Sequence, residues 1–266
     1  MQTPSETIKE FKDEWAQQLL DESYCNEFDV NFGQPCTYCS SKDETNDLAY
    51  YRCTECFLGA PMCKYCMVSS HCFSPFHRIE RWTGTHLEKE FLNNIGLIIY
   101  LGHSGQPCSK ASFIVETTIV HTSRIQMASI SYCGCEGQDK ATKPRPQQLI
   151  RSGLYLASFK RTSSAFSVAV LKQFYHLCTQ GKLTAHDFIA SLRRLTNYGF
   201  LDDSKDCYRE FMMAYRQFCF LRSLRWSHRR ADKILPEGSL AIECPACPQP
   251  KMNMDPIWKN CNKDLM

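Results

Sequence analysis

The sequence predicts an α+β protein in which a cysteine-rich, metal-stapled segment leads into a small antiparallel sheet and then a helical, basic half. Eleven of the 17 cysteines lie in the first 135 residues, β-branched runs follow the densest cluster, and helical periodicity dominates the later residues. The 266 residues are 43% hydrophobic and 22% charged, which is typical of a globular chain and excludes a disordered or fibrous protein.

The beginning of the chain indicates the cellular location. The first 20 residues are polar and acid-rich, without the apolar core of a secretory signal. The longest apolar stretch, 95–101, is too short to span a bilayer. We therefore expect an intracellular protein with no membrane partner, in a reducing compartment where disulfides do not persist. Seventeen cysteines that are not expected to form disulfides indicate metal binding.

The first 35 residues are expected to form an acidic helix and a lead-in. Within 6–20, Ile8, Phe11, Trp15 and Leu19 repeat near the helical period. Residues 1–50 contain 3 Lys/Arg and 11 Asp/Glu, a net charge of −8. The next segment, 36–77, lacks long apolar runs, so it cannot fold by hydrophobic burial alone.

Strands and then helices are expected further along the chain. The predicted strands are 96–101, 113–120 and 125–132. Three helices are predicted after them. The first covers 163–178, the second starts at the N-cap residue Thr184, and the third runs from after Ser204 to about 227. The expected organisation is 1–35 acidic helix, 36–137 cysteine cluster with sheet, 138–146 linker, 147–243 helical basic region and 244–266 a terminal CPxCP turn.

Three CxxC pairs and two histidines within 42 residues form the first cluster: Cys36, Cys39, Cys53, Cys56, Cys63, Cys66, His71 and His77. Two thiolates separated by two residues can face one ion, and zinc prefers four N or S ligands in a tetrahedron. Eight ligands therefore predict two zinc ions. The alternative is a set of buried or redox thiols, which three pairs at this density disfavour.

The pairs can be combined in sequence or interleaved. Loops of 13, 6 and 4 residues favour the interleaved cross-brace of B-box and RING modules. In that arrangement Cys36, Cys39, Cys63 and Cys66 hold one ion, and Cys53, Cys56, His71 and His77 hold the other. Cys72, beside His71, is an alternative ligand that the spacing does not exclude.

A third zinc site is predicted from a sparser set: His103, Cys108, Cys133 and Cys135. The sheet could bring the turn around the first two to the strand end that carries the Cys-Gly-Cys. The alternative is a satisfied histidine with core cysteines. Cys244 and Cys247, in the CPxCP turn, are further candidate metal ligands, with Cys261 as a third.

The second half of the chain is basic. Residues 140–230 hold 17 Lys/Arg and 5 Asp/Glu, a net charge of +12. Arginine side chains suit phosphate oxygens, and five arginines of the last predicted helix are candidate DNA contacts: Arg209, Arg216, Arg222, Arg225 and Arg229. They could equally form a solvated face or pair with the acidic N-terminal segment.

Nothing in the sequence indicates catalysis. GxSxG, P-loop, GxGxxG and HExxH motifs are absent. Four-ligand zinc sites leave no coordination position for water, so they indicate a structural role. Asp187, Asp202, Asp203 and Asp206 are better explained as helix-start residues.

The order of motifs resembles the CxC-type cysteine cluster associated with KDZ (Kyakuja-Dileera-Zisupton) transposases. The match extends over residues 10 to 258. Its first part contains YRCxxC, a second CxxC pair, a histidine, PFHRI and WTG within 51–84, followed by LGH and a cysteine within 101–108 and CGC at 133–135. Its second part contains QLI and GLY within 148–155, AFS and a leucine within 165–171, and CPACP and an asparagine within 244–253. Ser109 and Ser158-Phe159 depart from the prolines usual there.

This resemblance implies a zinc-chelating region N-terminal to a transposase of fungal mobile elements, with a nuclear location. The catalytic domain would follow Asn253, where only 13 residues remain, so a truncated copy or a fragment without enzymatic activity is expected.

The sequence therefore predicts a non-catalytic zinc module that assists DNA or partner binding of the transposase. The alternative is a B-box-like protein-interaction module without DNA binding. A RING is a weaker option because RING domains place a single Cys-x-His pair between their CxxC pairs.

Overall fold

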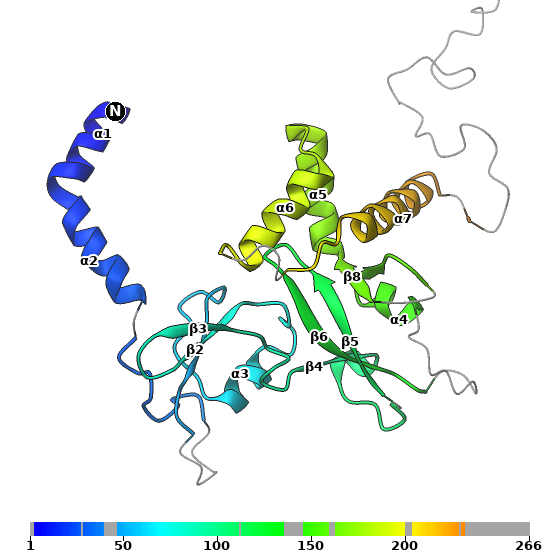
Figure 1. The fold of residues 1–266 in the computed structure, drawn as a ribbon, viewed down its shortest axis with the longest axis horizontal. Helices are drawn as coiled ribbons and strands as arrows, with labels where there is room; N and C mark the ends of the chain where they lie inside the picture. Colours follow the sequence, from blue (N-terminus) through cyan, green and yellow to red (C-terminus); the bar gives the residue numbers. More distant parts are fainter. Residues whose placement is uncertain are drawn as a thin grey trace, which may run out of the picture. The chain divides into compact units, whose positions relative to one another are not determined.

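The computed structural model describes residues 3–27, 29–39, 47–111, 113–135, 146–159, 163–199, 204–228 and 230–231. The chain divides into two compact units, 1–214 and 215–266. Helices and strands both contribute to it, so the α+β class is confirmed (Figure 1).

The N-terminal unit begins with an uninterrupted helical segment. It consists of α1 (Pro4–Glu10), a π-helical turn η1 (Phe11–Trp15) and α2 (Ala16–Glu27). The Thr3 side chain accepts a hydrogen bond from the Glu6 N–H, and the Glu6 carboxylate accepts one from the Thr3 N–H. This capping box satisfies two N–H groups that have no partner within the helix. The helix expected over 6–20 forms within this longer one.

The cysteine-rich segment folds around a three-stranded antiparallel sheet in the order β1 (Tyr51–Cys53), β2 (Ile79–Trp82) and β3 (Leu87–Glu90), together with the short helix α3 (Lys64–Ser70). Its small core contains Met62 and Met67 and takes further apolar side chains from beyond position 77, namely Ile79, Leu92, Ile95 and Leu97. The lack of long apolar runs in 36–77 agrees with this arrangement, because much of the core comes from residues after position 77.

A five-stranded sheet follows, with the order β4-β6-β5-β8-β7. Its strands are β4 (Ile98–Leu101), β5 (Ile114–Val120), β6 (Ile125–Tyr132), β7 (Leu154–Leu156) and β8 (Ser164–Ser167). The three expected strands are present, and β5 pairs antiparallel with β6. However, β4 runs parallel to β6 and β5 parallel to β8, so this sheet is mixed rather than antiparallel. The reason is that the 102–113 connection carries the chain past β6 before β5 begins.

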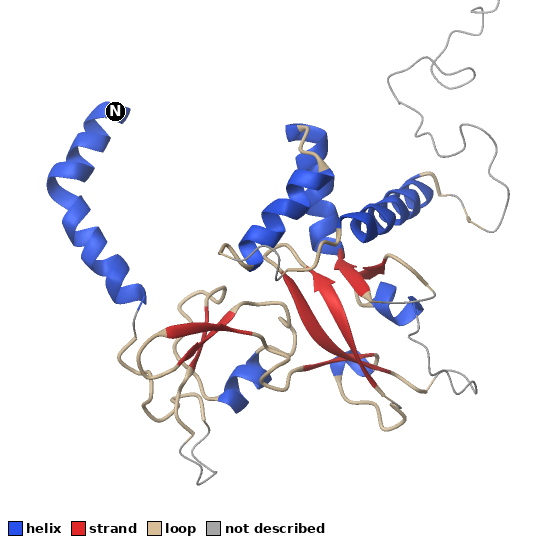
Figure 2. Ribbon diagram, in the orientation of Figure 1, coloured by secondary structure: helices blue, strands red, loops and turns tan. Residues whose placement is uncertain are grey.

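The helices expected after the sheet are α5 (Val168–Gly181), α6 (Ala185–Thr196) and α7 (Tyr208–Trp226), with the short α4 (Pro146–Arg151) before them (Figure 2). Thr184 caps α6 as expected. The helix predicted to start at 163 begins five residues later, because the fully buried 164–167 segment pairs with β5. Pairing and burial in the sheet favour an extended conformation there, although the periodicity predicts a helix.

Four phenylalanines join this sheet to the helices. Phe166 of β8, Phe174 of α5, Phe188 of α6 and Phe211 at the start of α7 have ring centroids 5.1–5.7 Å apart in four of their pairings. Each of these side chains is at most 4% exposed. They form the aromatic core on which the helices pack.

Strands from both sides of the predicted linker 138–146 pair in this one sheet. Of the linker itself only Pro146 is described, and it opens α4. The regions 36–137 and 147–243 are thus connected through β5 and β8. None of the helices in the described ranges combines the length and apolar character needed to cross a membrane.

Candidate metal centres

Two groups of four cysteine and histidine side chains lie in the cysteine-rich segment. Cys36, Cys39, Cys63 and Cys66 form the first group, and Cys53, Cys56, His71 and His77 form the second group. In each group all ligand atoms lie within 4.8 Å of one another. The structure thus brings together the same interleaved sets that the loop lengths favour.

Distances in the first group match the edges of a tetrahedron. The Cys39 Sγ lies 3.6 Å from the Cys63 Sγ and 3.7 Å from the Cys66 Sγ. An ion with metal–sulfur bonds of about 2.3 Å places its ligand sulfurs about 3.8 Å apart in tetrahedral geometry. The group is therefore of the right size for one metal ion.

Backbone N–H groups position and polarise these sulfurs. The Cys63 N–H donates to the Cys36 Sγ at 3.2 Å, and the Cys66 N–H donates to the Cys63 Sγ at 3.4 Å. Cys63 also caps α3, so the helix start fixes this pair. Burial raises the pKa of Cys36, but the N–H groups of Cys63 and Tyr38 outweigh it and lower the pKa overall.

The pKa values of the neighbouring thiols shift in the opposite direction. The hydrogen bond with Cys63, together with burial, raises the pKa of Cys39 to about 11. Burial, followed by contacts with Cys63 and Cys39, raises the pKa of Cys66. One thiolate therefore opposes ionisation of the next, and a cation at the centre is what would allow all four to be charged.

The second group has the size expected for mixed sulfur and nitrogen ligands. The Cys56 Sγ lies 3.4 Å from the His71 Nε2 and 3.5 Å from the His77 Nδ1, and the Cys53 Sγ lies 3.6 Å from the His77 Nδ1. Bonds of about 2.3 Å to sulfur and 2.0–2.1 Å to nitrogen give tetrahedral edges of about 3.5 Å. This group also fits one ion.

His71 is held in the tautomer that a metal requires. Its ring is 1% exposed, and the Nδ1 lies 2.9 Å from the Met67 carbonyl oxygen. A carbonyl can only accept, so the Nδ1 carries the proton and the Nε2 lone pair faces Cys56. Cys72, the alternative ligand, is exposed and lies outside the group.

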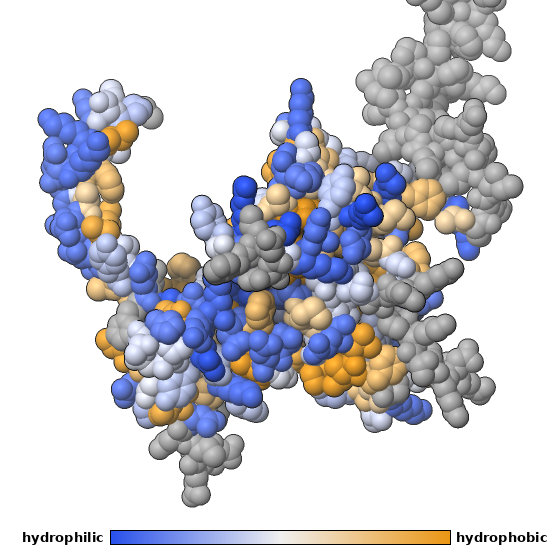
Figure 3. Space-filling view, viewed as in Figure 1, coloured by the Kyte–Doolittle hydropathy of each residue, from blue (hydrophilic) through white to orange (hydrophobic). Residues whose placement is uncertain are grey.

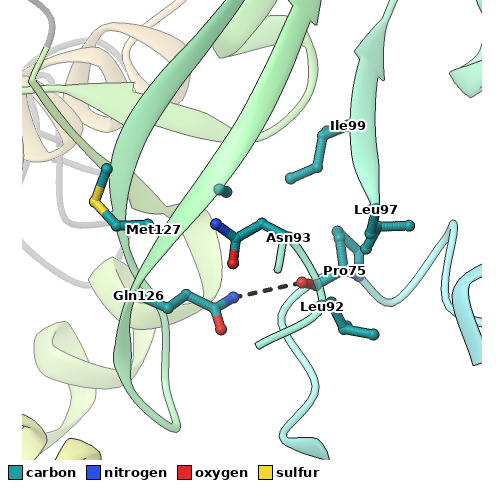
Figure 4. Close-up of a pocket in the computed structure, with 8 residues that line it drawn as sticks. Pro75, Leu92, Asn93, Leu97, Ile99, Gln126 and Met127 are labelled. Carbon is teal, nitrogen blue, oxygen red and sulfur yellow. Dashed lines mark hydrogen bonds between the residues drawn. The ribbon is translucent and has the colours of Figure 1, made fainter. Parts of the chain in front are cut away.

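The turn between β5 and β6 braces the segment that carries His77. The Arg124 guanidinium donates to the His77 carbonyl oxygen at 3.0 Å, and the Arg78 guanidinium donates to the Ser123 carbonyl oxygen. The Gln126 amide reaches the Pro75 carbonyl at 3.4 Å, beside a small pocket (Figure 4). Hydrogen bonds therefore join the metal-binding segment to the five-stranded sheet.

Arg124 is buried to an unusual degree for a charged side chain. It is 5% exposed, and its guanidinium lies 4.8 Å from the centroid of the Phe91 ring. Burial, with the nearby Arg78 charge, lowers the pKa of Arg124 to about 10. Because burying a charge is costly, its contacts with the Phe91 ring and the His77 carbonyl must offset that cost.

Replacing Arg124 with Met should weaken metal binding at the second group about 10- to 100-fold, the range found for outer partners of metal ligands. The reason is that the carbonyl of His77 loses its donor and the ligand loop loses its brace. Chelator titration of the metal-loaded chain measures this change. Arg81→Met, which removes an exposed ion pair with Glu88, is the matched control and should have no effect. Equal metal retention in both variants would contradict the bracing role.

His103, Cys108, Cys133 and Cys135 form the third group, again within 4.8 Å. The His103 Nε2 lies 3.2 Å from the Cys133 Sγ and 3.4 Å from the Cys135 Sγ, and the Cys108 Sγ lies 3.6 Å from the Cys135 Sγ. These distances again approximate tetrahedral edges. His103 and Cys135 are exposed, whereas Cys53 and His71 of the second group are buried.

Parallel pairing of β4 with β6 assembles the third group. Leu101 pairs with Tyr132 at the ends of the two strands, so the next residues of each strand emerge side by side. One strand continues into His103, and the other continues into Cys133. The strand ends meet here as the sequence predicts, although through parallel rather than antiparallel pairing.

The backbone around the third group is strained, and one of its glycines cannot take a side chain without a clash. Residues 102–105 all have positive φ, including His103 at 46° and Ser104 at 54°. A Cβ at Gly134, between the two cysteines, would lie 2.0 Å from the Lys110 carbonyl oxygen. The middle residue of the Cys-Gly-Cys sequence is therefore fixed by the close approach of the 108–111 turn.

Gln148 holds the backbone of this group in place. Its side-chain amide donates to the Cys133 carbonyl and accepts from the Cys133 N–H, both at 2.9 Å. The N–H of Gly134, first among several hydrogen bonds, lowers the pKa of Cys108 to about 6, which favours the thiolate that a metal binds. Sequence reasoning missed Gln148 and Arg124, because no ligand spacing marks them.

The remaining candidate residues lie either outside the described residues or on α7. Cys244, Cys247, Cys261 and Arg229 lie outside the described residues. On α7, Arg209, Arg216 and Arg225 are exposed, and the Arg222 guanidinium lies 4.5 Å from the centroid of the Trp226 ring.

The middle of the chain is similar to a known protein family. Residues 92–199 match the family model described as "CxC2 like cysteine cluster associated with KDZ transposases". This segment contains all four residues of the third group, and the first two groups precede it. Neither the curated proteins nor the solved structures gave a match. The resemblance expected from the sequence is thus confirmed for residues 92–199, which are similar to the CxC2-like cysteine cluster associated with KDZ transposases, and the match does not extend over the rest of the range 10–258.

Proposed function

We propose that the chain is a non-catalytic module that binds three zinc ions, with the first two groups arranged as a B-box-like cross-brace. The observation that carries the proposal is the presence of three groups in which four Cys or His ligand atoms lie within 4.8 Å of one another. All twelve ligands are thiols or imidazoles, the donor set that zinc prefers in four-coordinate structural sites.

The zinc ions would act as cross-links rather than as catalysts. Each group supplies four protein ligands, which leaves no position for a reactive water. The cysteine-rich core is small, so metal binding would contribute much of its folding free energy. We accordingly expect no metal-dependent cleavage of DNA by this chain.

The module would help a transposase to hold DNA or a partner protein. In the DNA interpretation the contacts are Arg229 and the four arginines of α7, of which Arg209, Arg216 and Arg225 are exposed. Stacking on Trp226 would pre-orient the Arg222 guanidinium for a phosphate. The net charge of +12 over residues 140–230 favours an anionic partner.

Salt dependence of DNA binding tests this interpretation. Each neutralised phosphate contributes about 0.9 to the slope of log K against log salt. The zinc-loaded chain should bind duplex DNA non-specifically, and Arg222, Arg225, Arg229→Ala should reduce the slope by about 2–3 units. Arg81→Ala, far from α7 in sequence, is the control.

Absent binding at low salt, or a slope that the triple variant leaves unchanged, would exclude the DNA role. The B-box-like interaction module would then be favoured. Its own supporting observation is the set of bulky apolar side chains exposed beside the ligands of the second group: Phe57 at 93%, Leu58 at 84% and Phe73 at 79%.

A further inference from the structure

The N-terminal helix presents an exposed apolar stripe. Ile8, Phe11, Trp15 and Leu19 are 56%, 48%, 48% and 50% exposed. They follow one another at three- and four-residue steps, so they share one side of the helix. Figure 3 shows hydrophobic surface in orange along one edge of this helix and hydrophilic surface in blue along the other. No described side chain of 3–27 is buried.

The same helix is strongly acidic. Residues 3–27 contain seven Asp/Glu and two Lys, a net charge of −5. That charge opposes contact with nucleic acid, with an anionic membrane surface, or with a second copy of the same helix. The partner of the stripe should therefore be a basic protein surface with apolar side chains.

One helix of this chain offers such a surface. On α7, Arg209, Met213, Arg216 and Phe220 are all exposed, with Met213 at 49% and Phe220 at 42%. Their spacing of three and four residues places them on one side of α7. The stretches 8–19 and 209–220 each span twelve residues, so both stripes are about 17 Å long. The two stripes match in length and in apolar content, and they carry opposite charge.

We propose that the N-terminal helix docks on the 209–220 face of α7 in a second copy of this chain. The two stripes have opposite charge, equal length and exposed apolar side chains, so each is a suitable partner for the other stripe in a second copy. Two-fold symmetry would form the contact twice, once from each chain. Apolar burial would supply affinity, and the acidic helix would neutralise Arg209 and Arg216.

The proposed contact uses two arginines that the DNA interpretation also uses, so DNA and the second copy would compete for α7. The two proposals are nevertheless tested separately, because self-association is measured without DNA. Sedimentation of the zinc-loaded full chain should show a concentration-dependent dimer at low salt. High salt should shift it toward monomer.

Phe11→Gln with Trp15→Gln should abolish the dimer, and so should Arg209→Glu with Arg216→Glu. Tyr24→Gln is the matched control, because Tyr24 is an exposed aromatic of the same helix that lies off the stripe. Unchanged circular dichroism and zinc content establish that the variants are folded. All substituted side chains are exposed, so unfolding is not expected.

Mixing the two double variants gives the sharpest result. Each lacks one half of the contact, yet a mixed pair retains one intact helix–α7 contact. Equal amounts should therefore associate more than either variant alone, though less than the unsubstituted chain. A monomeric unsubstituted chain, a dimer that survives either double substitution, or a mixture that stays monomeric would each overturn the proposal.

Discussion

Cys63→Ser is expected to unfold the 36–97 segment and to reduce the zinc content from three ions per chain to one, because that segment also contains the second group. Cys63 is a ligand of the first group, caps α3 and donates its N–H to the Cys36 Sγ. Structural zinc sites contribute about 10–16 kcal/mol of apparent binding free energy at neutral pH. Losing one ligand should therefore cost several kcal/mol of that stabilisation, enough to melt a small core.

Elemental analysis and hydrogen exchange together measure this outcome. Cys72→Ser is the matched control, because Cys72 is exposed and belongs to no group. Amides of β1 to β3 should lose protection in the first variant and keep it in the control. If Cys63→Ser retained three zinc ions with full protection, the structural role of the first group would be wrong.

Gly134→Ala should remove the third metal ion while leaving the first two in place. The added Cβ would meet the Lys110 carbonyl oxygen at 2.0 Å, and both elements are backbone, so the turn must shift. That shift separates Cys108 from Cys133 and Cys135. We expect two zinc ions per chain and a loss of about 3 kcal/mol or more, as for other severe backbone clashes.

The control is Gly181→Ala at the end of α5, where a Cβ would meet nothing within 4 Å. Such a substitution at a compatible backbone position is neutral or slightly stabilising. Thermal unfolding and metal content distinguish the two glycines. Three retained zinc ions and an unchanged melting temperature in Gly134→Ala would contradict the close approach of the two turns.

The sequence predicts the ligand groups well because their spacing carries the information. Two thiols in a CxxC turn must point to a common centre, and loop lengths limit which turns can meet. Arg124 and Gln148 follow no such rule. They act on backbone groups of residues 47 and 15 positions away, and one sequence contains no trace of that contact.

Strand β8 illustrates why part of the fold was missed. Ala165-Phe166-Ser167 continues the helical pattern of α5, so periodicity alone assigns it to the helix. Only the presence of β5 beside it, through pairs such as Val120 with Phe166, makes an extended conformation favourable. Parallel pairing of β4 with β6 was missed for the same reason, because strand order is a property of the assembled sheet.

The position of β8 also has a consequence during synthesis. Phe166 leaves the ribosome 46 residues after Val120, its partner in β5. Every ligand of the three groups has been made by then, so the metal-binding part of a nascent chain can assemble first. The outer edge of β5 stays unpaired through that interval, and an open strand edge is a template for aggregation. The step that needs protection in the cell is therefore the arrival of β8, rather than the loading of metal.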